Sequence, residues 1–146
     1  MIALVQRVAG ARVEVGGEVV AAVERGLMVL VCAEPADEEA QAIRLVDKLL
    51  KLRIFADAEG RMNRALRDFD GGLLLVPQFT LAADCGGGNR PSFSAAAPPD
   101  QGRRLFEAVV RIARQRWAKV EAGVFGADMQ VHLVNDGPVT IPLTLR

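Results

Sequence analysis

The amino-acid sequence predicts one α/β domain that spans residues 1–146. Two segments carry apolar residues at helical spacing, and they lie among runs of β-branched and aliphatic residues that are typical of strands. With 146 residues, 51% of them hydrophobic, the chain can bury one substantial core but not the cores of two ordinary domains. We therefore expect a single domain with a sheet and two main helices, and no linker or internal repeat.

The N-terminal part of the chain predicts three strands. Gly16 and Gly17 stand between two β-rich runs, and a two-glycine turn is typical of a hairpin because glycine tolerates positive φ. Residues 4–15 are therefore expected to pair with residues 18–23. Residues 26–32 form an aliphatic run without polar alternation, which is typical of a strand covered on both faces. We expect this third strand inside the sheet.

A helix is expected over about residues 37–51. Its apolar residues recur at helical spacing, and the acidic residues at 37–39 would favour the N-terminal end of the helix dipole. The apolar positions are Ala40, Ile43, Leu45, Val46, Leu49 and Leu50. After the helix, residues 53–55 resemble a short strand and residues 57–60 a turn. Residues 73–76 predict a second buried strand.

The second half of the chain predicts a long loop, a helix and two strands. Residues 84–99 are irregular and rich in glycine, and long loops in small domains are often functional. The helix is expected over residues 100–117. Two strands are expected at residues 129–134 and 139–145, joined at a Gly-Pro turn in residues 135–138. A trans hairpin turn is the ordinary interpretation of that joint, because cis X-Pro bonds are rare.

Charge is balanced overall but segregated along the chain. Eighteen basic and eighteen acidic residues leave no net charge, so no whole-molecule field draws the chain onto nucleic acid or an anionic membrane. Two segments are nevertheless basic, residues 48–67 and residues 103–119. In the second segment the only anion is Glu107, and the cations are Arg103, Arg104, Arg111, Arg114, Arg116 and Lys119. A solvated helix face is the ordinary interpretation, and contact with the phosphates of a folded RNA is the alternative.

Several classes of protein are excluded by what the sequence lacks. No apolar run approaches the roughly 20 residues needed to cross a bilayer. The N-terminus has no pattern of a secretory signal, so the cytoplasm is the expected location. Cys32 and Cys85 are too few for a disulfide framework or a four-ligand zinc site. Because no glycine cluster matches a nucleotide-binding fingerprint either, we expect no metal site and no nucleotide cradle.

Three residues after the second buried strand could face a ligand. Gln78, Phe79 and Thr80 lie between that strand and the glycine-rich loop, where backbone amides and a hydroxyl can be presented at the edge of a sheet. Thr80 could act as a nucleophile or as a hydrogen-bond donor, although a threonine without a nearby histidine is usually structural. Cys85 and His132 are the one thiol and imidazole combination available, so a thiol hydrolase is an alternative.

Specific motifs in a fixed order run through nearly the whole chain. They are Ala3–Val8, Gly26–Val31, Lys48–Phe55, Gln78–Asp84, Asn89–Phe93, Phe125–Met129 and Asn135–Thr140. Together they resemble the D-aminoacyl-tRNA deacylase family. The resemblance implies a layered α/β fold in which mixed β-sheets form a barrel-like core with two main helices. It also implies a cytoplasmic homodimer that needs no cofactor and hydrolyses the ester between a D-amino acid and the 3′-terminal adenosine of tRNA, a proofreading step in translation.

The resemblance assigns a role in chirality to Gly137-Pro138. This dipeptide would be cis and would enter the site of the partner subunit. Its carbonyls would hold the amino group of the substrate and leave no room for an L side chain. Arg7 resembles the arginine that supports this turn in the family.

The resemblance assigns the opposite wall of the site to Gln78, Phe79 and Thr80, the expected catalytic residues. Backbone amides there would stabilise the developing oxyanion. Phe79, Phe125 and Met129 would pack around the terminal adenosine. The family is described as using the ribose 2′-hydroxyl of the RNA to assist attack by water. Thr80 as nucleophile is the competing description, and we favour the RNA-assisted mechanism.

Three features depart from the family pattern: Pro77, Gly102 where alanine is usual, and the lysine-free loop at residues 85–88. The last two bear on the fit of the adenosine or the affinity for tRNA. The family usually has serine where this chain has Pro77, which removes a hydroxyl and a backbone N–H. A related class that removes L-alanine from tRNA also has proline there. A relaxed-specificity enzyme that clears L-alanyl-tRNA is therefore one alternative function, activity on glycyl-tRNA is left open, and a non-catalytic tRNA-binding module that uses the basic helix is another alternative.

Overall fold

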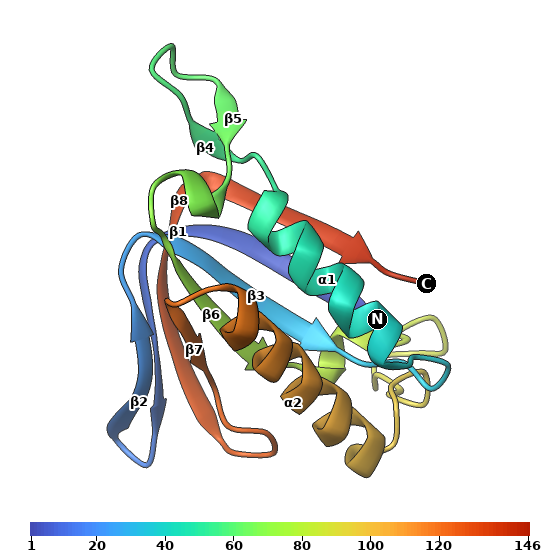
Figure 1. The fold of residues 1–146 in the computed structure, drawn as a ribbon. Helices are drawn as coiled ribbons and strands as arrows, with labels where there is room; N and C mark the ends of the chain where they lie inside the picture. The colour runs from blue at the N-terminus through green and yellow to red at the C-terminus, as the bar shows by residue number, and fades with distance from the viewer.

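The computed structural model describes residues 1–146, which form a six-stranded sheet, a two-stranded hairpin and two helices (Figure 1). The strands of the sheet are β1 (Ile2–Val15), β2 (Glu18–Val23), β3 (Gly26–Cys32), β6 (Gly72–Pro77), β7 (Val120–Ala122) and β8 (Met129–Thr144). The hairpin consists of β4 (Phe55–Ala56) and β5 (Met62–Arg64), and the helices are α1 (Glu39–Lys51) and α2 (Pro99–Arg116). Two short 3₁₀ helices are η1 (Leu66–Asp68) and η2 (Phe79–Ala82). The predicted α/β class is confirmed.

The long strand β1 organises the sheet, because it pairs with three neighbours. Its N-terminal half runs antiparallel to β3, and its C-terminal half runs antiparallel to β2. β8 pairs with β1 over almost its whole length. Gly16 and Gly17 adopt φ values of 58° and 82°, as the predicted hairpin requires. β3 and β6 are parallel neighbours at the centre of the sheet, so the strand expected inside the sheet is there.

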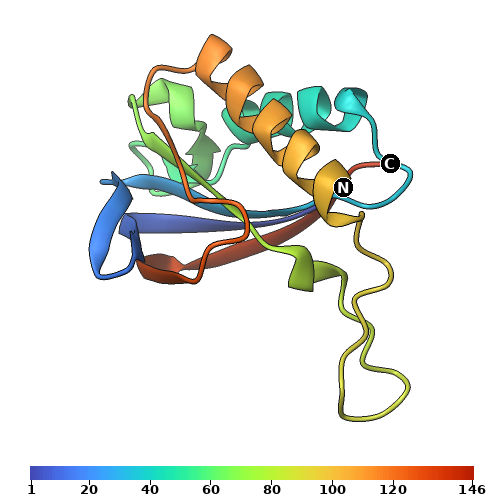
Figure 2. The same cartoon turned by 90° about the horizontal axis from the view of Figure 1, so that it is seen from below.

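Alternate side chains of the central strands enter two separate cores. The fully buried residues on the helix side are Leu27, Val29, Leu73 and Leu75, and they pack against α1 and α2. Their neighbours Met28, Leu74 and Val76 point the other way, into a smaller cluster with residues of β1 and β2. β2 also contacts β6 and β7, so the sheet curls into a nearly closed barrel. Both helices lie on one side of it (Figure 2).

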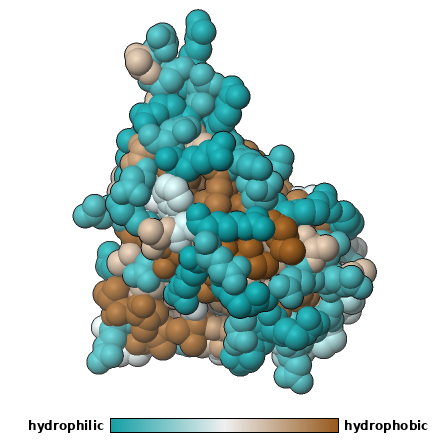
Figure 3. Space-filling model, viewed as in Figure 1, coloured by the Kyte–Doolittle hydropathy of each residue, from teal (hydrophilic) through white to brown (hydrophobic).

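The outer surface on the helix side is largely hydrophilic, and hydrophobic surface gathers toward the β2 end of the molecule (Figure 3). Val19 and Val20 of β2 are among the exposed large hydrophobic residues. Neither α1 nor α2 combines the length and the apolar character of a membrane-spanning helix.

Two predicted boundaries in the first half are wrong. The first helix begins at Glu39 rather than at residue 37. Glu38 has an extended backbone and is the N-cap residue. Asp37 is not in the first turn, since its carboxylate pairs with the N-terminal amine. The predicted strand 53–55 is observed as β4, which begins only at Phe55, where the chain first pairs with β5.

The two strands predicted near the C-terminus are one strand. Both halves of β8 pair with β1, and two register shifts in β1 between Gln6 and Gly10 accommodate the bend between them. The hairpin interpretation is therefore wrong, because the chain keeps its direction through the Gly-Pro dipeptide. The Gly137-Pro138 bond is cis, as the family resemblance implied. β7 was not predicted, since three residues are too few to show a strand pattern.

Candidate active site

The start of η2 places three of the predicted residues at the end of β6. The backbone N–H of Gln78 donates to the Val31 carbonyl at 2.8 Å, which extends the pairing of β6 with β3 by one residue past Pro77. The side-chain Nε2 of Gln78 donates to Oγ1 of Thr80 at 2.6 Å. The N–H groups of Phe79 and Thr80 are the first of the helix, so their acceptors must come from outside it.

A pocket of about 670 Å³ lies beside η2. Hydrophobic residues make up most of its lining, and they come from the ends of β3 and β6, the loop before α2, the first turns of α2 and the segment that enters β8. Those that matter most below are Gln78, Phe79, Phe93, Gly102, Phe125 and Met129. This size and lining are typical of a site for a small molecule or for one end of a larger one.

Aromatic rings border the pocket on two sides. Phe79 is 56% exposed and packs edge-on against Phe93, with 5.0 Å between the ring centroids. On the other side the guanidinium carbon of Arg103 lies 4.9 Å from the centroid of Phe125. Gly102 lies beside this ring, and a Cβ at that position would make ordinary van der Waals contact with it, 3.4 Å from Cζ of Phe125. Phe79 is exposed and Phe93 and Phe125 are half-buried, and rings at the border of a pocket are suited to stacking against a nucleic-acid base.

Cys32 lines the pocket next to the backbone of Phe79. Its Sγ is 3.4 Å from the carbonyl oxygen of Ala33 and 3.5 Å from that of Phe79. Burial raises the pKa of the Cys32 thiol, mainly because the thiolate would lose its solvation. The thiol therefore stays protonated at neutral pH and acts as a hydrogen-bond donor to the backbone near η2, not as a nucleophile.

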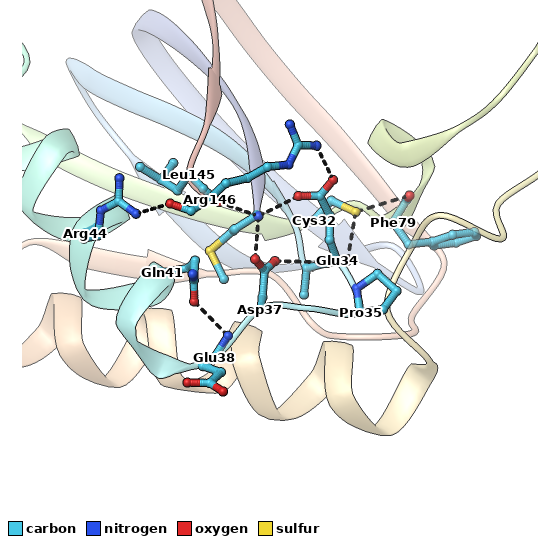
Figure 4. Close-up of polar contacts among 12 residues, drawn as sticks. Cys32, Glu34, Pro35, Asp37, Glu38, Gln41, Arg44, Phe79, Leu145 and Arg146 are labelled. Atoms are coloured by element: carbon cyan, nitrogen blue, oxygen red, sulfur yellow. Dashed lines mark hydrogen bonds and ion pairs between the residues drawn. The ribbon is translucent and has the colours of Figure 1, made fainter.

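The N-terminal amine anchors the same end of the sheet (Figure 4). The Met1 amine is fully buried and donates to Asp37 Oδ1 at 2.7 Å, to Glu34 Oε2 at 2.8 Å and to the Leu145 carbonyl at 2.8 Å. Burial raises the pKa of Glu34, but hydrogen bonds from the Met1 amine and from Arg146 outweigh it, and the net pKa is lowered. Because Met1 also lines the pocket, these ion pairs fix the pocket wall.

A second group of predicted residues surrounds the Gly-Pro bend of β8. Arg7 donates from Nε to the Asp136 carbonyl at 3.0 Å and from Nη1 to the Ile54 carbonyl at 2.7 Å. Gly137 has φ of 131°, and a Cβ there would lie 2.9 Å from Nη2 of Arg7. Both Gly137 and Pro138 are exposed. Arg7 therefore supports the bend from behind and leaves the dipeptide facing outward.

Within one chain the bend and the pocket lie at opposite ends of the sheet. Arg7 is opposite Leu27 near the start of β3, whereas the pocket lies at Val31 and Cys32 at its end. Four or five strand residues separate them, or about 13–17 Å along β3. Gly137 and Pro138 are not part of the pocket lining.

Comparison with known proteins identifies the relationship. The sequence profile of a family described as D-Tyr-tRNA(Tyr) deacylase matches residues 4–144. The chain belongs to this family. It is 66% identical over 145 residues to a D-aminoacyl-tRNA deacylase of Aromatoleum aromaticum, covering 99% of this chain and 95% of that relative. It is 61% identical over 143 residues to one of Pseudomonas aeruginosa, covering 98% of this chain and 99% of the relative.

Two solved structures share the fold of this chain. A c-Myc DNA Unwinding Element Binding Protein superimposes with a TM-score of 0.93 at 39% sequence identity, covering 100% of this chain and 99% of the other. A probable eukaryotic D-amino acid tRNA deacylase superimposes with a TM-score of 0.84 at 18% identity, covering 97% of each chain. The second likeness shows the fold alone.

In this member of the deacylase family, the predicted site residues fall into two groups. Gln78, Phe79, Phe125 and Met129 line one pocket. Thr80 contacts Gln78 next to the pocket but is not part of its lining. The second group, composed of Arg7, Gly137 and Pro138, surrounds the distant bend of β8.

Residues that the sequence analysis did not assign complete the pocket. Phe93 belongs to the Asn89–Phe93 motif, which was noted as part of a loop, so the signal was present but its contact with η2 was not evident. Met1 and Cys32 carried no local signal of a site, whereas Gly102 was noted only as a departure from the family pattern. The thiol and imidazole alternative gains no support. Cys85 is exposed in the loop, and Nε2 of His132 on β8 lies 3.3 Å from Oε2 of Glu14 on β1.

Proposed function

We propose that this chain hydrolyses the ester bond between a D-amino acid and the 3′-terminal adenosine of tRNA, and that the pocket holds the aminoacyl-adenosine end. The observation that carries this proposal is the apolar pocket bordered by Phe79 and Phe125, next to the first N–H groups of η2. Its volume suits a nucleoside with an attached amino acid. Relatives named D-aminoacyl-tRNA deacylase, among them one that is 66% identical, support the same substrate class.

The chemical step uses positioning and oxyanion stabilisation. Water attacks the ester carbonyl, and the N–H groups of Phe79 and Thr80 donate to the oxygen that becomes negative. The C–O bond to the ribose then breaks, the ribose oxygen takes a proton, and the amino acid leaves with its carboxylate. The neighbouring 2′-hydroxyl of the RNA assists the attacking water. Thr80 is in this mechanism a positioning residue, with its hydroxyl held by Gln78.

The ionisable groups of the pocket favour a mechanism in which the protein positions the ester and the RNA assists the water. Its lining includes no histidine, and its titratable side chains are Cys32 and the exposed Asp128. The raised pKa of Cys32 keeps that thiol neutral. Neither a histidine nor an ionised thiol is therefore available in the pocket as a general base, whereas an aminoacyl ester is labile enough to react when it is held correctly.

Chirality is read by the Gly137-Pro138 dipeptide of a second copy of the chain. The carbonyls of the dipeptide accept hydrogen bonds from the substrate amino group, and its atoms occupy the space that an L side chain would need. Two features of the chain support this role. The dipeptide is exposed, and its own pocket lies at the other end of the sheet.

An apolar sheet face supports the homodimer. Ile2 and Leu4 of β1 point away from the helices and are only half-buried, and Pro142 of β8, opposite Leu4, is exposed. The helices cover only the other side of the sheet (Figure 2). This face lies between the bend and η2, so a two-fold pairing across it would bring the bend of each copy to the pocket of the other. Contact with tRNA and a cytoplasmic location follow from the substrate class.

Three charged tRNAs test the reaction and its specificity. Purified protein is incubated with D-tyrosyl-tRNA, L-tyrosyl-tRNA and L-alanyl-tRNA, and release of the amino acid is compared with a no-enzyme control. We expect cleavage of the D ester only, with Pro77 a tolerated variation. Release of L-alanine would instead support the relaxed-specificity alternative, and tRNA binding without any cleavage would support a binding module.

Subunit mixing tests the shared site. A Gly137→Ala chain keeps its pocket, and a Phe79→Ala chain keeps its bend. If the site combines two copies, random mixing of the two inactive variants restores about a quarter of the wild-type sites, because half of the dimers carry one intact composite site. A mixture that stays inactive would show that each chain uses its own bend.

A further inference from the structure

Arg103 differs from the other unpaired arginines of α2 in its contact with Phe125, a residue that lines the pocket. Pro99, Gly102 and Phe106 line the pocket from the first turns of this helix. At about 100° per residue, Arg103 lies roughly 70° from their mean direction, whereas Arg104 lies roughly 170° away. Arg103 is therefore at the rim of the pocket, and Arg104 is on the solvent side of the same helix.

The guanidinium of Arg103 is oriented but not neutralised. It stacks over Phe125 at 4.9 Å, and its Nη2 lies 3.8 Å from the position that a Cβ of Gly126 would occupy. No carboxylate lies within ion-pair distance of it, whereas Arg111 on the same helix pairs with Glu39 at 2.8 Å. A stacked guanidinium loses little conformational freedom on binding, and its N–H groups match two phosphate oxygens.

From this placement we infer that Arg103 binds the phosphodiester that connects the terminal adenosine to the rest of the tRNA. This inference rests on the proposed function, because it needs the adenosine in the pocket. The 5′-phosphate of a nucleoside stacked on Phe125 would lie on this side of the pocket, where Arg103 is a cation without an ion pair. Phosphate contacts of this kind fix position on the nucleic acid rather than read its sequence.

Three substrates that differ in their phosphates separate this role from a purely structural one. They are D-tyrosyl-tRNA, the dinucleotide ester cytidylyl-adenosine-3′-D-tyrosine with one phosphodiester, and 3′-D-tyrosyl-adenosine with none. For Arg103→Ala we expect KM to rise about 10-fold on the first two, with kcat nearly unchanged. On the adenosine ester we expect no change. The slope of log(kcat/KM) against log salt for tRNA should fall by about 0.7.

Two further variants control for charge and for packing. Arg104→Ala removes the same charge from the adjacent position and should leave all three substrates unaffected. Arg103→Lys keeps the charge but loses the planar stacking, so it should recover part of the loss. An equal loss on the adenosine ester would overturn the inference, since Arg103 would then act only by holding Phe125. An equal loss in Arg104→Ala, or no loss in Arg103→Ala, would overturn it as well.

The same series keeps the two proposals distinct. Cleavage of 3′-D-tyrosyl-adenosine by the wild-type protein supports the deacylase function whatever happens at Arg103. A wild-type protein that cleaves none of the three esters would overturn the proposed function and this inference with it.

Discussion

The pocket end and the bend end of the sheet are held in different ways. At the pocket end, the Met1 amine is 0% exposed and pairs with Asp37, itself 5% exposed, at 2.7 Å. At the bend end, the Arg7 Nε and Asp136 Oδ2 are 3.6 Å apart and the Asp136 side chain is 52% exposed. One end is thus completed within a single chain, whereas the other presents the Gly137-Pro138 dipeptide outward. In the proposed dimer, this difference would make the pocket the receiving surface and the bend the inserted one.

The largest effect is expected from breaking the buried ion pair at the pocket end. Asp37→Asn leaves the buried Met1 amine with Glu34 as its remaining anion and should lower the free energy of unfolding by about 3 kcal/mol. Urea or thermal unfolding measures this loss. Glu39→Gln removes an exposed pair with Arg111 and should cost at most about 1 kcal/mol. Equal losses in the two variants would mean that the buried ion pair stabilises the fold no more than the exposed one.

At the bend end, substitution should affect activity more than stability. Gly137→Ala puts a Cβ 2.9 Å from both Arg7 Nη2 and Val139 Cγ2, at a φ of 131° that L side chains rarely adopt. The bend must shift, and we expect kcat/KM for D-aminoacyl-tRNA to fall about 100-fold, since displacement of a positioning group by 1 Å has effects of this size.

A matched glycine tests whether the position matters. Gly87→Ala lies in the long loop, with nothing within 4 Å of its added Cβ and no positive φ. It should keep near wild-type activity. If Gly137→Ala retains full activity with a folded circular dichroism spectrum, the bend has no part in the reaction.

The sequence predicts what depends on neighbouring residues and misses what depends on distant ones. The Gly16-Gly17 hairpin, β3 and α2 follow from local pattern, and the structure has all three. β8 was divided in two because a Gly-Pro dipeptide usually ends a strand. Only its pairing with β1 on both sides of the bend makes it continuous. The acidic residue Asp37 was likewise assigned to a helix dipole, since nothing local indicates a partner 36 residues away.

The candidate site shows the same limit. Phe79 and Phe125 were assigned through motifs of the family resemblance, and both line the pocket. Phe93 was not assigned, because its contact with Phe79 depends on how residues 84–98 fold back over η2. The separation of Gly137 from the pocket was also invisible in the sequence, since it follows from the register of β1 with β3 and β8.

A smaller effect is expected at Thr80. Its Oγ1 accepts a hydrogen bond from Gln78 and is not part of the pocket lining, so Thr80→Ala should keep activity within about 10-fold of wild type. A tRNA ending in 2′-deoxyadenosine should abolish cleavage by both proteins, because the assisting hydroxyl is absent. An inactive Thr80→Ala protein that still binds tRNA would favour Thr80 as the nucleophile.

The smallest expected effect is the dependence of stability on the charge of Glu34, at the pocket end, as the pH falls. Burial raises the pKa of Glu34, but the hydrogen bonds from the Met1 amine and Arg146 lower it more, so the folded-state pKa lies below the unfolded value of about 4.3. A depressed carboxyl pKa stabilises the fold above the unfolded pKa, and this stability is lost as pH falls through the folded pKa. The free energy of unfolding of the wild type should therefore exceed that of Glu34→Gln by about 1 kcal/mol at pH 7. The urea midpoints of the two proteins should converge below about pH 4.

Glu107→Gln, at an exposed position without an ion pair, is the matched control and should have the stability of the wild type at every pH. A gap between wild type and Glu34→Gln that persists unchanged at pH 3 would mean that the charge of Glu34 does not hold the pocket end.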